Sequence, residues 1–169
     1  LNVDPPVAQG VRQSLEHAYY RSAAANALRL AELERILAEF TALGAPILLL
    51  KGAAFAEALY GNAALRPMSD LDFATTEPHV PACQAALREL GYAPISVEES
   101  PGFNLAYRSQ QGFRNPDLLS GYVELHWHLV EVPYYLQNLP MEWFWDHCTP
   151  STFGSQIAQV LDPMSNLLY

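Results

Sequence analysis

The distribution of apolar residues along the chain predicts helices first and a small sheet after them. Residues 7–43 carry apolar side chains at three- and four-residue steps, which indicates amphipathic helices, and we divide this stretch into two. The stripe is clearest in the second helix, at Leu30, Leu33, Leu37, Phe40 and Leu43. Gly44 and Pro46 follow directly, a combination typical of a helix C-terminus.

Short apolar runs after this point predict strands. Residues 47–50 are all apolar, as in a strand that is buried on both faces. Gly52 opens a helix that extends to about residue 60. The remaining expected elements are strands at 71–74, 92–97, 103–109 and 122–129, a loop around 111–116, and helices at 76–90, at 139–148 and from residue 163 onward.

Two acidic residues lie at the strand expected over residues 71–74. Asp70 and Asp72 are separated by Leu71, so in a strand both carboxylates project from one face, with Cα atoms about 6.6 Å apart. They would repel each other by roughly 2.5 kcal/mol at an effective dielectric constant near 20. A divalent cation reverses the sign of that interaction, and Mg²⁺ prefers such oxygen ligands. The pair therefore predicts a metal site, although Asp-x-Asp is also common at solvated strand edges.

A third acid stands in the strand expected over residues 122–129. Alternation places Glu124, His126 and His128 on one face of that strand. If the two acidic strands are neighbours, Asp70, Asp72 and Glu124 converge. Three carboxylates suit two Mg²⁺ ions, which hold phosphates during an in-line displacement.

The order of these motifs resembles that of the DNA polymerase β-like nucleotidyltransferase superfamily, and more narrowly the uncharacterised bacterial nucleotidyltransferases. The resemblance covers roughly residues 30 to 130. It rests on Leu49-Leu50-Lys51-Gly52, Tyr60, Arg66, Asp70-Leu71-Asp72 and Glu124-Leu125-His126-Trp127. It implies an α+β fold, in which a small mixed β-sheet is flanked by helices and preceded by a helical pair. We expect residues 1–45 to pack on a catalytic domain of residues 46–169, and this domain to continue beyond Tyr169 in the full-length protein.

The resemblance also implies a role for each acidic residue. Asp70 and Asp72 would hold the metal ions, Mg²⁺ or Mn²⁺, that bind a nucleoside triphosphate. Glu124 would bind the second metal and help to deprotonate the attacking hydroxyl. His126 is a possible substrate contact, and a half-buried structural histidine is the alternative.

The implied phosphate-binding residues are Lys51, Gly52, Ala53 and Arg66. Gly52 and Ala53 would open a helix whose first amides face the phosphates. Most of the superfamily has Ser or a second Gly after this glycine, whereas this chain has Ala53, so Lys51 is expected to supply a point charge instead. Arg66 is either a phosphate clamp or the partner of an aspartate in an ion pair.

Composition limits the class of protein. The 169 residues are half hydrophobic, which suits one folded domain, and the net charge of −9 makes long nucleic acid an unfavourable partner. The apolar runs are too short to span a membrane, and the two cysteines form no CxxC pair. We expect a cytoplasmic protein.

These features predict an Mg²⁺-dependent nucleotidyltransferase. It would move a nucleoside monophosphate from an NTP, most simply ATP, to a hydroxyl of a small-molecule or protein acceptor. One alternative is a metallohydrolase that uses Glu124, His126 and His128 with the aspartates. The other is an inactive, antitoxin-like regulatory module with the same fold.

Overall fold

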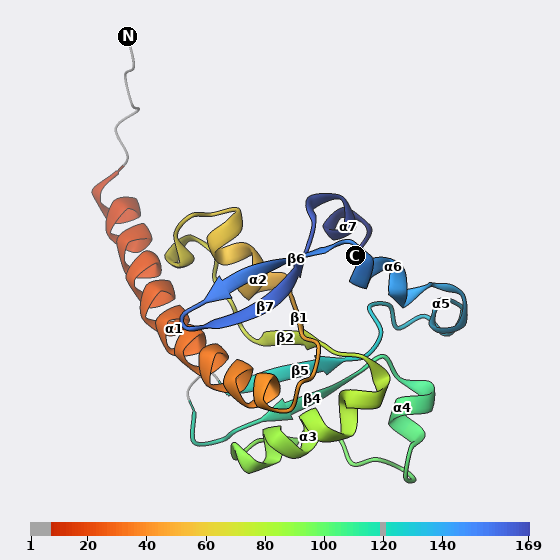
Figure 1. Cartoon of the computed structure of the whole chain (residues 1–169). Helices are drawn as coiled ribbons and strands as arrows, with labels where there is room; N and C mark the ends of the chain where they lie inside the picture. The colour runs from red at the N-terminus through yellow and green to blue at the C-terminus, as the bar shows by residue number, and fades with distance from the viewer. Residues whose placement is uncertain (1–7, 119–120) are drawn as a thin grey trace.

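The computed structural model describes residues 8–118 and 121–169 and contains one seven-stranded mixed sheet with helices around it (Figure 1). The strand order is β3-β4-β5-β2-β1-β7-β6. The α+β class and the mixed sheet predicted from the sequence are thus confirmed. The strands are β1 (Leu48–Leu50), β2 (Leu71–Ala74), β3 (Ala93–Pro94), β4 (Gln110–Arg114), β5 (Tyr122–His126), β6 (Cys148–Phe153) and β7 (Gln156–Leu161). The helices are α1 (Gln9–Ala42), α2 (Lys51–Ala58), η1 (Ala63–Leu65), η2 (Glu77–His79), α3 (Val80–Glu89), α4 (Phe103–Tyr107), α5 (Pro133–Asn138), α6 (Met141–Asp146) and α7 (Pro163–Leu168).

Three central strands determine where the acidic residues lie. Strand β2 pairs antiparallel with β1 and parallel with β5. The register places Asp72 opposite Leu50 on one side and opposite Glu124 on the other. The two strands that carry the acidic residues are therefore neighbours, as expected.

The two faces of the sheet differ in character. Alternate residues of β2 and β5 are apolar, completely buried and part of the main core: Leu71, Phe73, Val123 and Leu125. Helices α1 and α3 pack against this face (Figure 1). Because side chains alternate along a strand, Asp72, Glu124 and His126 lie on the opposite face. A second, smaller cluster of buried apolar residues, which includes Leu48 and Phe144, is separate from the main core.

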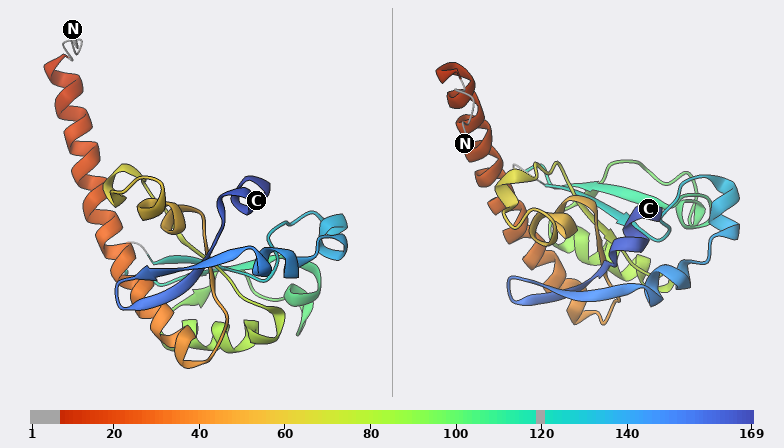
Figure 2. Two further views of the ribbon diagram at one scale, coloured as in Figure 1. Left: turned by 45° about the horizontal axis from the view of Figure 1, so that its top comes forward. Right: turned by 90° about the horizontal axis from the view of Figure 1, so that it is seen from above.

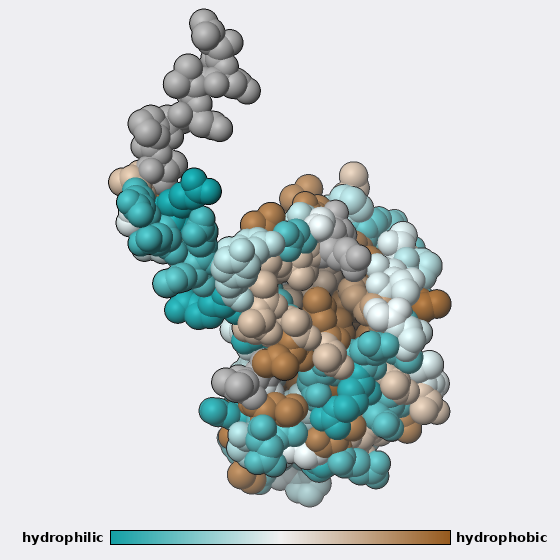
Figure 3. All heavy atoms as spheres, turned by 90° about the vertical axis from the view of Figure 1, so that its left-hand side faces the viewer, coloured by the Kyte–Doolittle hydropathy of each residue, from teal (hydrophilic) through white to brown (hydrophobic). Residues whose placement is uncertain are grey.

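The expected helical pair over residues 7–43 is wrong, because one continuous helix, α1, covers Gln9–Ala42, and residue 7 lies outside the described residues. No glycine or proline interrupts the chain between Gly10 and Gly44, so the helix has no reason to break. Its C-terminal half joins the core through buried residues such as Leu33 and Phe40. The N-terminal half extends beyond the sheet and is mainly hydrophilic (Figures 2 and 3). The proposed boundary at residue 45 stays a prediction.

Three other expectations also need correction. Residues 103–107 form helix α4 rather than a strand, and the rings of Phe103 and Tyr107 lie 5.0 Å apart on one face of it. Residues 110–114 form strand β4 where a loop was expected, and β3 has only two residues. The β6–β7 hairpin and α5 were not predicted. Within the described residues, no helix is long and apolar enough to cross a membrane.

Candidate functional site

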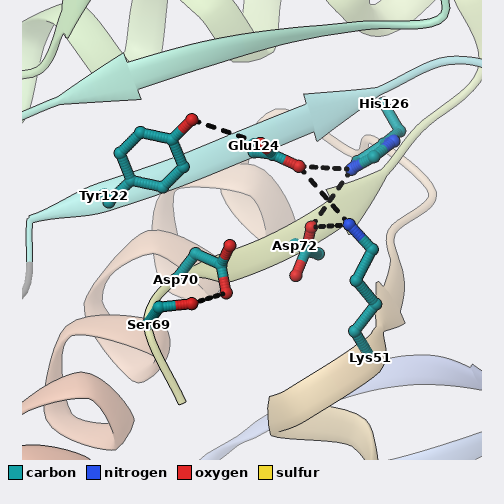
Figure 4. Close-up of polar contacts among 7 residues, drawn as sticks. All are labelled: Lys51, Ser69, Asp70, Asp72, Tyr122, Glu124 and His126. Carbon is teal, nitrogen blue, oxygen red and sulfur yellow. Dashed lines mark hydrogen bonds and ion pairs between the residues drawn. The ribbon is translucent and has the colours of Figure 1, made fainter.

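Asp72, Glu124 and His126 come together on the face of the sheet that is away from α1 (Figure 4). Each offers one ligand atom, and these atoms all lie within 4.8 Å of one another. Asp72 and Glu124 meet because they are register partners on parallel strands, and His126 follows Glu124 on the same face. His126 Nε2 lies 3.3 Å from Asp72 Oδ1 and 3.5 Å from Glu124 Oε2.

Lys51 reaches the same cluster from the start of α2. Its Nζ donates to Asp72 Oδ1 at 2.6 Å and to Glu124 Oε2 at 3.4 Å (Figure 4). Lys51 is the only lysine in the sequence. Among the residues that the structure describes, it is also the only non-glycine with a positive φ, at 47°. Such a backbone conformation costs of order 1–3 kcal/mol and is often found at functional sites.

The charges in the cluster support one another. The hydrogen bond from His126 lowers the pKa of Glu124 to about 2, and Lys51 adds to this effect, although burial opposes it. Burial alone would lower the pKa of Lys51, but the hydrogen bond and charge of Asp72 raise it above its ordinary value. The pKa of His126 is likewise raised, because its bonds to Asp72 and Glu124 outweigh its burial. At neutral pH the Glu124 carboxylate is therefore ionised and can face a cation.

One oxygen of the cluster has no partner. Asp72 is 1 % exposed, and within residues 8–118 and 121–169 its Oδ2 accepts no hydrogen bond. A buried carboxylate oxygen without a partner is costly, and a metal ion is the kind of ligand that would satisfy it. The donor set of two carboxylates and an imidazole suits Mg²⁺ or, with the nitrogen included, Mn²⁺. These residues thus fit a divalent cation.

Asp70 lies beside the cluster rather than within it. It precedes β2, is partly exposed, and accepts a hydrogen bond from Ser69 Oγ at 3.0 Å. Figure 4 shows its side chain between Ser69 and Tyr122. Its ligand atoms do not join the group of Asp72, Glu124 and His126. The structure therefore brings two of the three predicted carboxylates together, and His126 is the third member of the group.

The residues predicted to bind phosphate lie in two separate segments: Gly52 and Ala53 in α2, and Arg66 directly after η1. Gly52 and Ala53 lie in the first turn of α2, whose N-cap Leu50 makes no side-chain capping bond. A Cβ on Gly52 would lie 2.9 Å from Met68 Cγ, so close packing also favours glycine here. Arg66 donates to the carbonyl of Pro67, and in the described part of the chain it forms no ion pair with an aspartate.

Two tyrosines near the site were missed. The hydroxyl of Tyr122 donates to Glu124 Oε1 at 3.2 Å. Tyr122 precedes Glu124 by two residues in the same strand, and this spacing could have predicted that both side chains lie on one face. Tyr169 also lies near the cluster: burial raises its pKa to about 12, and the charges of Lys51 and Asp72 act on it. No sequence pattern indicated this position. His128 lies outside the cluster, where its Nδ1 contacts Val130.

The chain matches the family described as uncharacterised nucleotidyltransferase over residues 1–169, and it belongs to this family. Among curated protein sequences it has no significant match.

Solved structures share the fold. The lincosamide antibiotic adenylyltransferase LnuA, with lincomycin bound, aligns with a TM-score of 0.57 and 19% identity, over 82% of this chain and 84% of that one. The solution structure of the antibiotic-resistance factor ANT(2'')-Ia aligns with a TM-score of 0.55 and 12% identity, over 82% of this chain and 68% of that one. The structure of ANT(2'')-Ia in complex with adenylyl-2''-tobramycin aligns with a TM-score of 0.53 and 14% identity. The alignment covers 79% of this chain and 69% of that one. Identities this low show the fold alone.

Proposed function

We propose that this protein transfers a nucleoside monophosphate from an NTP, with ATP the first candidate, to a hydroxyl of a small molecule, and that it requires Mg²⁺. The observation that carries the proposal is the register pairing of Asp72 with Glu124, beside which the buried Oδ2 of Asp72 has no partner among the described residues. The same cluster lies against the first residue of α2, in a chain of a nucleotidyltransferase family. In the reaction, the acceptor oxygen bonds to the α-phosphorus, the bond from that phosphorus to the bridging oxygen breaks, and pyrophosphate leaves.

Asp72 and Glu124 would hold the metal, with Asp70 and His126 beside them. A bound Mg²⁺ would neutralise charge on the phosphates and on the leaving pyrophosphate. Mn²⁺ would serve as well, since it accepts both oxygen and nitrogen ligands.

The chain's own residues would bind and orient the two substrates. The free amides at the start of α2, at Gly52 and Ala53, would face the phosphates together with Lys51, since helix N-termini attract anions. Glu124 is ionised at neutral pH and would accept the hydrogen bond of the acceptor hydroxyl. Because its low pKa makes it a weak base, it would take the proton only as the oxygen bonds to phosphorus and the hydroxyl becomes acidic. Arg66, whose guanidinium donates to the carbonyl of Pro67, would act as a phosphate clamp by exchanging that bond for one to a phosphate oxygen.

A small-molecule acceptor is the simplest choice. The structural neighbours include an adenylyltransferase with lincomycin bound and a complex with adenylyl-2''-tobramycin, and both names describe small molecules. The net charge of −9 argues against long nucleic acid as the acceptor. The cytoplasm, where ATP and Mg²⁺ are abundant, is the compartment that this reaction favours.

One observation favours a second candidate, a metallohydrolase. His126 lies among the carboxylates, and zinc accepts such a nitrogen ligand. Its predicted companion His128 lies outside the group, which weakens this reading. Tight stoichiometric zinc binding with hydrolysis of a substrate in the absence of any NTP would support the hydrolase.

The experiment is a transfer assay with the purified chain. NTPs labelled at the α-phosphate are incubated with Mg²⁺, Mn²⁺ or Zn²⁺ and a small-molecule cell extract, and labelled product and pyrophosphate are measured. Wild type should form both with Mg²⁺ or Mn²⁺, the Asp72→Asn variant should form neither, and the exposed control Asp117→Asn should match wild type. Nucleotide binding without turnover, together with a stable protein partner, would instead support a regulatory module.

A further inference from the structure

A cavity of about 570 Å³ adjoins the acidic cluster on the side away from Lys51. Residues of α4, of the strands β4 and β5, and of the segment that follows β3 line it. Pockets of about 300–1,000 Å³ are typical of sites for small molecules. Its size therefore suits a compound of one to a few rings rather than a macromolecule.

Glu124 belongs both to this cavity and to the acidic cluster. Its Oε2 lies 3.4 Å from Lys51 Nζ and 3.5 Å from His126 Nε2. Its Oε1 accepts from the hydroxyl of Tyr122, and both Tyr122 and Glu124 line the cavity. Figure 4 shows Tyr122 and Lys51 at opposite ends of the Glu124 carboxylate. A molecule in the cavity would thus approach the carboxylate from the side opposite Lys51.

The charges in the cavity wall favour a cation. Three carboxylates line it, from Glu99, Glu124 and Glu131, against one guanidinium, from Arg108. Within the described residues, Glu99 and Glu131 form no ion pair, and both are exposed to an incoming ligand. The ring of Tyr107, which also lines the cavity, offers a face for a cation–π contact. This wall would repel the triphosphate, whose place is at Lys51 and the start of α2.

A buried polar atom in the same wall has no partner. Ser109 lines the cavity and is 3 % exposed, and its hydroxyl makes no hydrogen bond within residues 8–118 and 121–169. Buried polar atoms in folded proteins nearly always have a partner. Ser109 therefore adds to the cavity lining a buried residue whose hydroxyl has no partner among the described residues.

We infer that this cavity is the acceptor site, and that the acceptor is a hydroxyl-bearing small molecule with at least one positively charged amine. The inference rests on the proposed nucleotidyl transfer and specifies its second substrate. In the cavity, the amine pairs with Glu99 and Glu131, and one hydroxyl lies at Glu124. That hydroxyl gives its proton to Glu124 as its oxygen bonds to the α-phosphorus of the NTP and pyrophosphate leaves.

The test compares matched ligands that differ in charge. Binding of glucosamine and of tobramycin is measured by saturation-transfer NMR against the form of each in which every amine is N-acetylated. The amines should bind and their neutral forms should not. The double variant Glu99→Gln/Glu131→Gln should weaken amine binding about two- to thirtyfold, as expected for two exposed ion pairs. The control Glu89→Gln, an exposed residue of α3, should leave binding unchanged.

A separate titration with MgATP distinguishes a failure of the acceptor site from a failure of nucleotide binding. The double variant should bind MgATP as wild type does, because Glu99 and Glu131 lie in the cavity wall and not at Lys51. If MgATP binds but neither amine does, or if amines and neutral forms bind alike, the acceptor inference is wrong and nucleotidyl transfer stands. If MgATP fails to bind wild type, the proposed function itself is wrong.

Discussion

Replacing Lys51 with methionine separates two roles that the structure gives to one ammonium group. Lys51 Nζ lies 2.6 Å from Asp72 Oδ1 and 3.4 Å from Glu124 Oε2, so it neutralises the carboxylates that would hold a metal. If the same ammonium also contacts phosphate, its removal has opposite effects on the two ligands. Lys51→Met should strengthen binding of Mn²⁺ alone and weaken binding of MgATP.

The magnitude follows from the geometry of the ion pair. A hydrogen bond between charged groups contributes about 1.5–3 kcal/mol, and exposed ion pairs contribute about 0.2–1 kcal/mol. The side chain of Lys51 is 41% exposed and that of Asp72 is 1% exposed, so we expect about 1–2 kcal/mol after screening. At about 1.4 kcal/mol per factor of ten, Mn²⁺ should bind roughly five- to thirtyfold more tightly, and MgATP more weakly by a similar factor.

Electron paramagnetic resonance of free Mn²⁺ measures the first affinity, and titration calorimetry measures the second. Arg35→Met, which removes a cation paired with Glu32 away from the site, serves as the control and should change neither. The free energy of unfolding of Lys51→Met should fall in EDTA, because the buried Asp72 loses one of its two partners and keeps only His126, and added Mn²⁺ should restore it. Unchanged or weaker Mn²⁺ binding in Lys51→Met would refute the reasoning.

The remaining predictions concern catalysis, the hairpin and pH. Glu124→Gln should reduce the rate of transfer by about 10²–10⁴-fold while MgATP affinity changes less, as stopped-flow kinetics would show. Gly154→Ala should destabilise the fold by about 1–3 kcal/mol in urea titrations, because φ is +60° and a Cβ would clash with the Glu34 carboxylate; Gly10→Ala, in open space, is the control. Hydrogen bonds from Ser155 lower the pKa of Glu34, so stability should be fully present above the unfolded pKa and be lost as the pH falls through the folded pKa; Glu34→Gln should remove this dependence.

The convergence of Asp72 and Glu124 could be predicted because both residues follow local rules, whereas Asp70 does not join them. Because side chains alternate along a strand, Asp72 and Glu124 project from the same face of the sheet, and the register of β2 with β5 places them side by side. The buried stripe in the C-terminal half of α1 was visible for the same reason, since it repeats with the period of a helix.

The features that were missed depend on contacts distant in sequence. Strand β6 contains Pro150, which argues against a central strand, but β6 lies at the edge of the sheet, where proline is tolerated. The segment Phe103–Tyr107 is too short for its periodicity to distinguish helix from strand. The contact of Lys51 with Asp72 depends on a left-handed backbone at residue 51, which a non-glycine residue does not signal.

The most direct test is a crystal structure of the protein with Mn²⁺ and a non-hydrolysable ATP analogue, examined by anomalous diffraction. The account predicts an anomalous peak within ligand distance of both Asp72 and Glu124, with the phosphates toward Lys51 and the start of α2. A fully occupied peak that contacts neither carboxylate, with the nucleotide bound elsewhere, would contradict it.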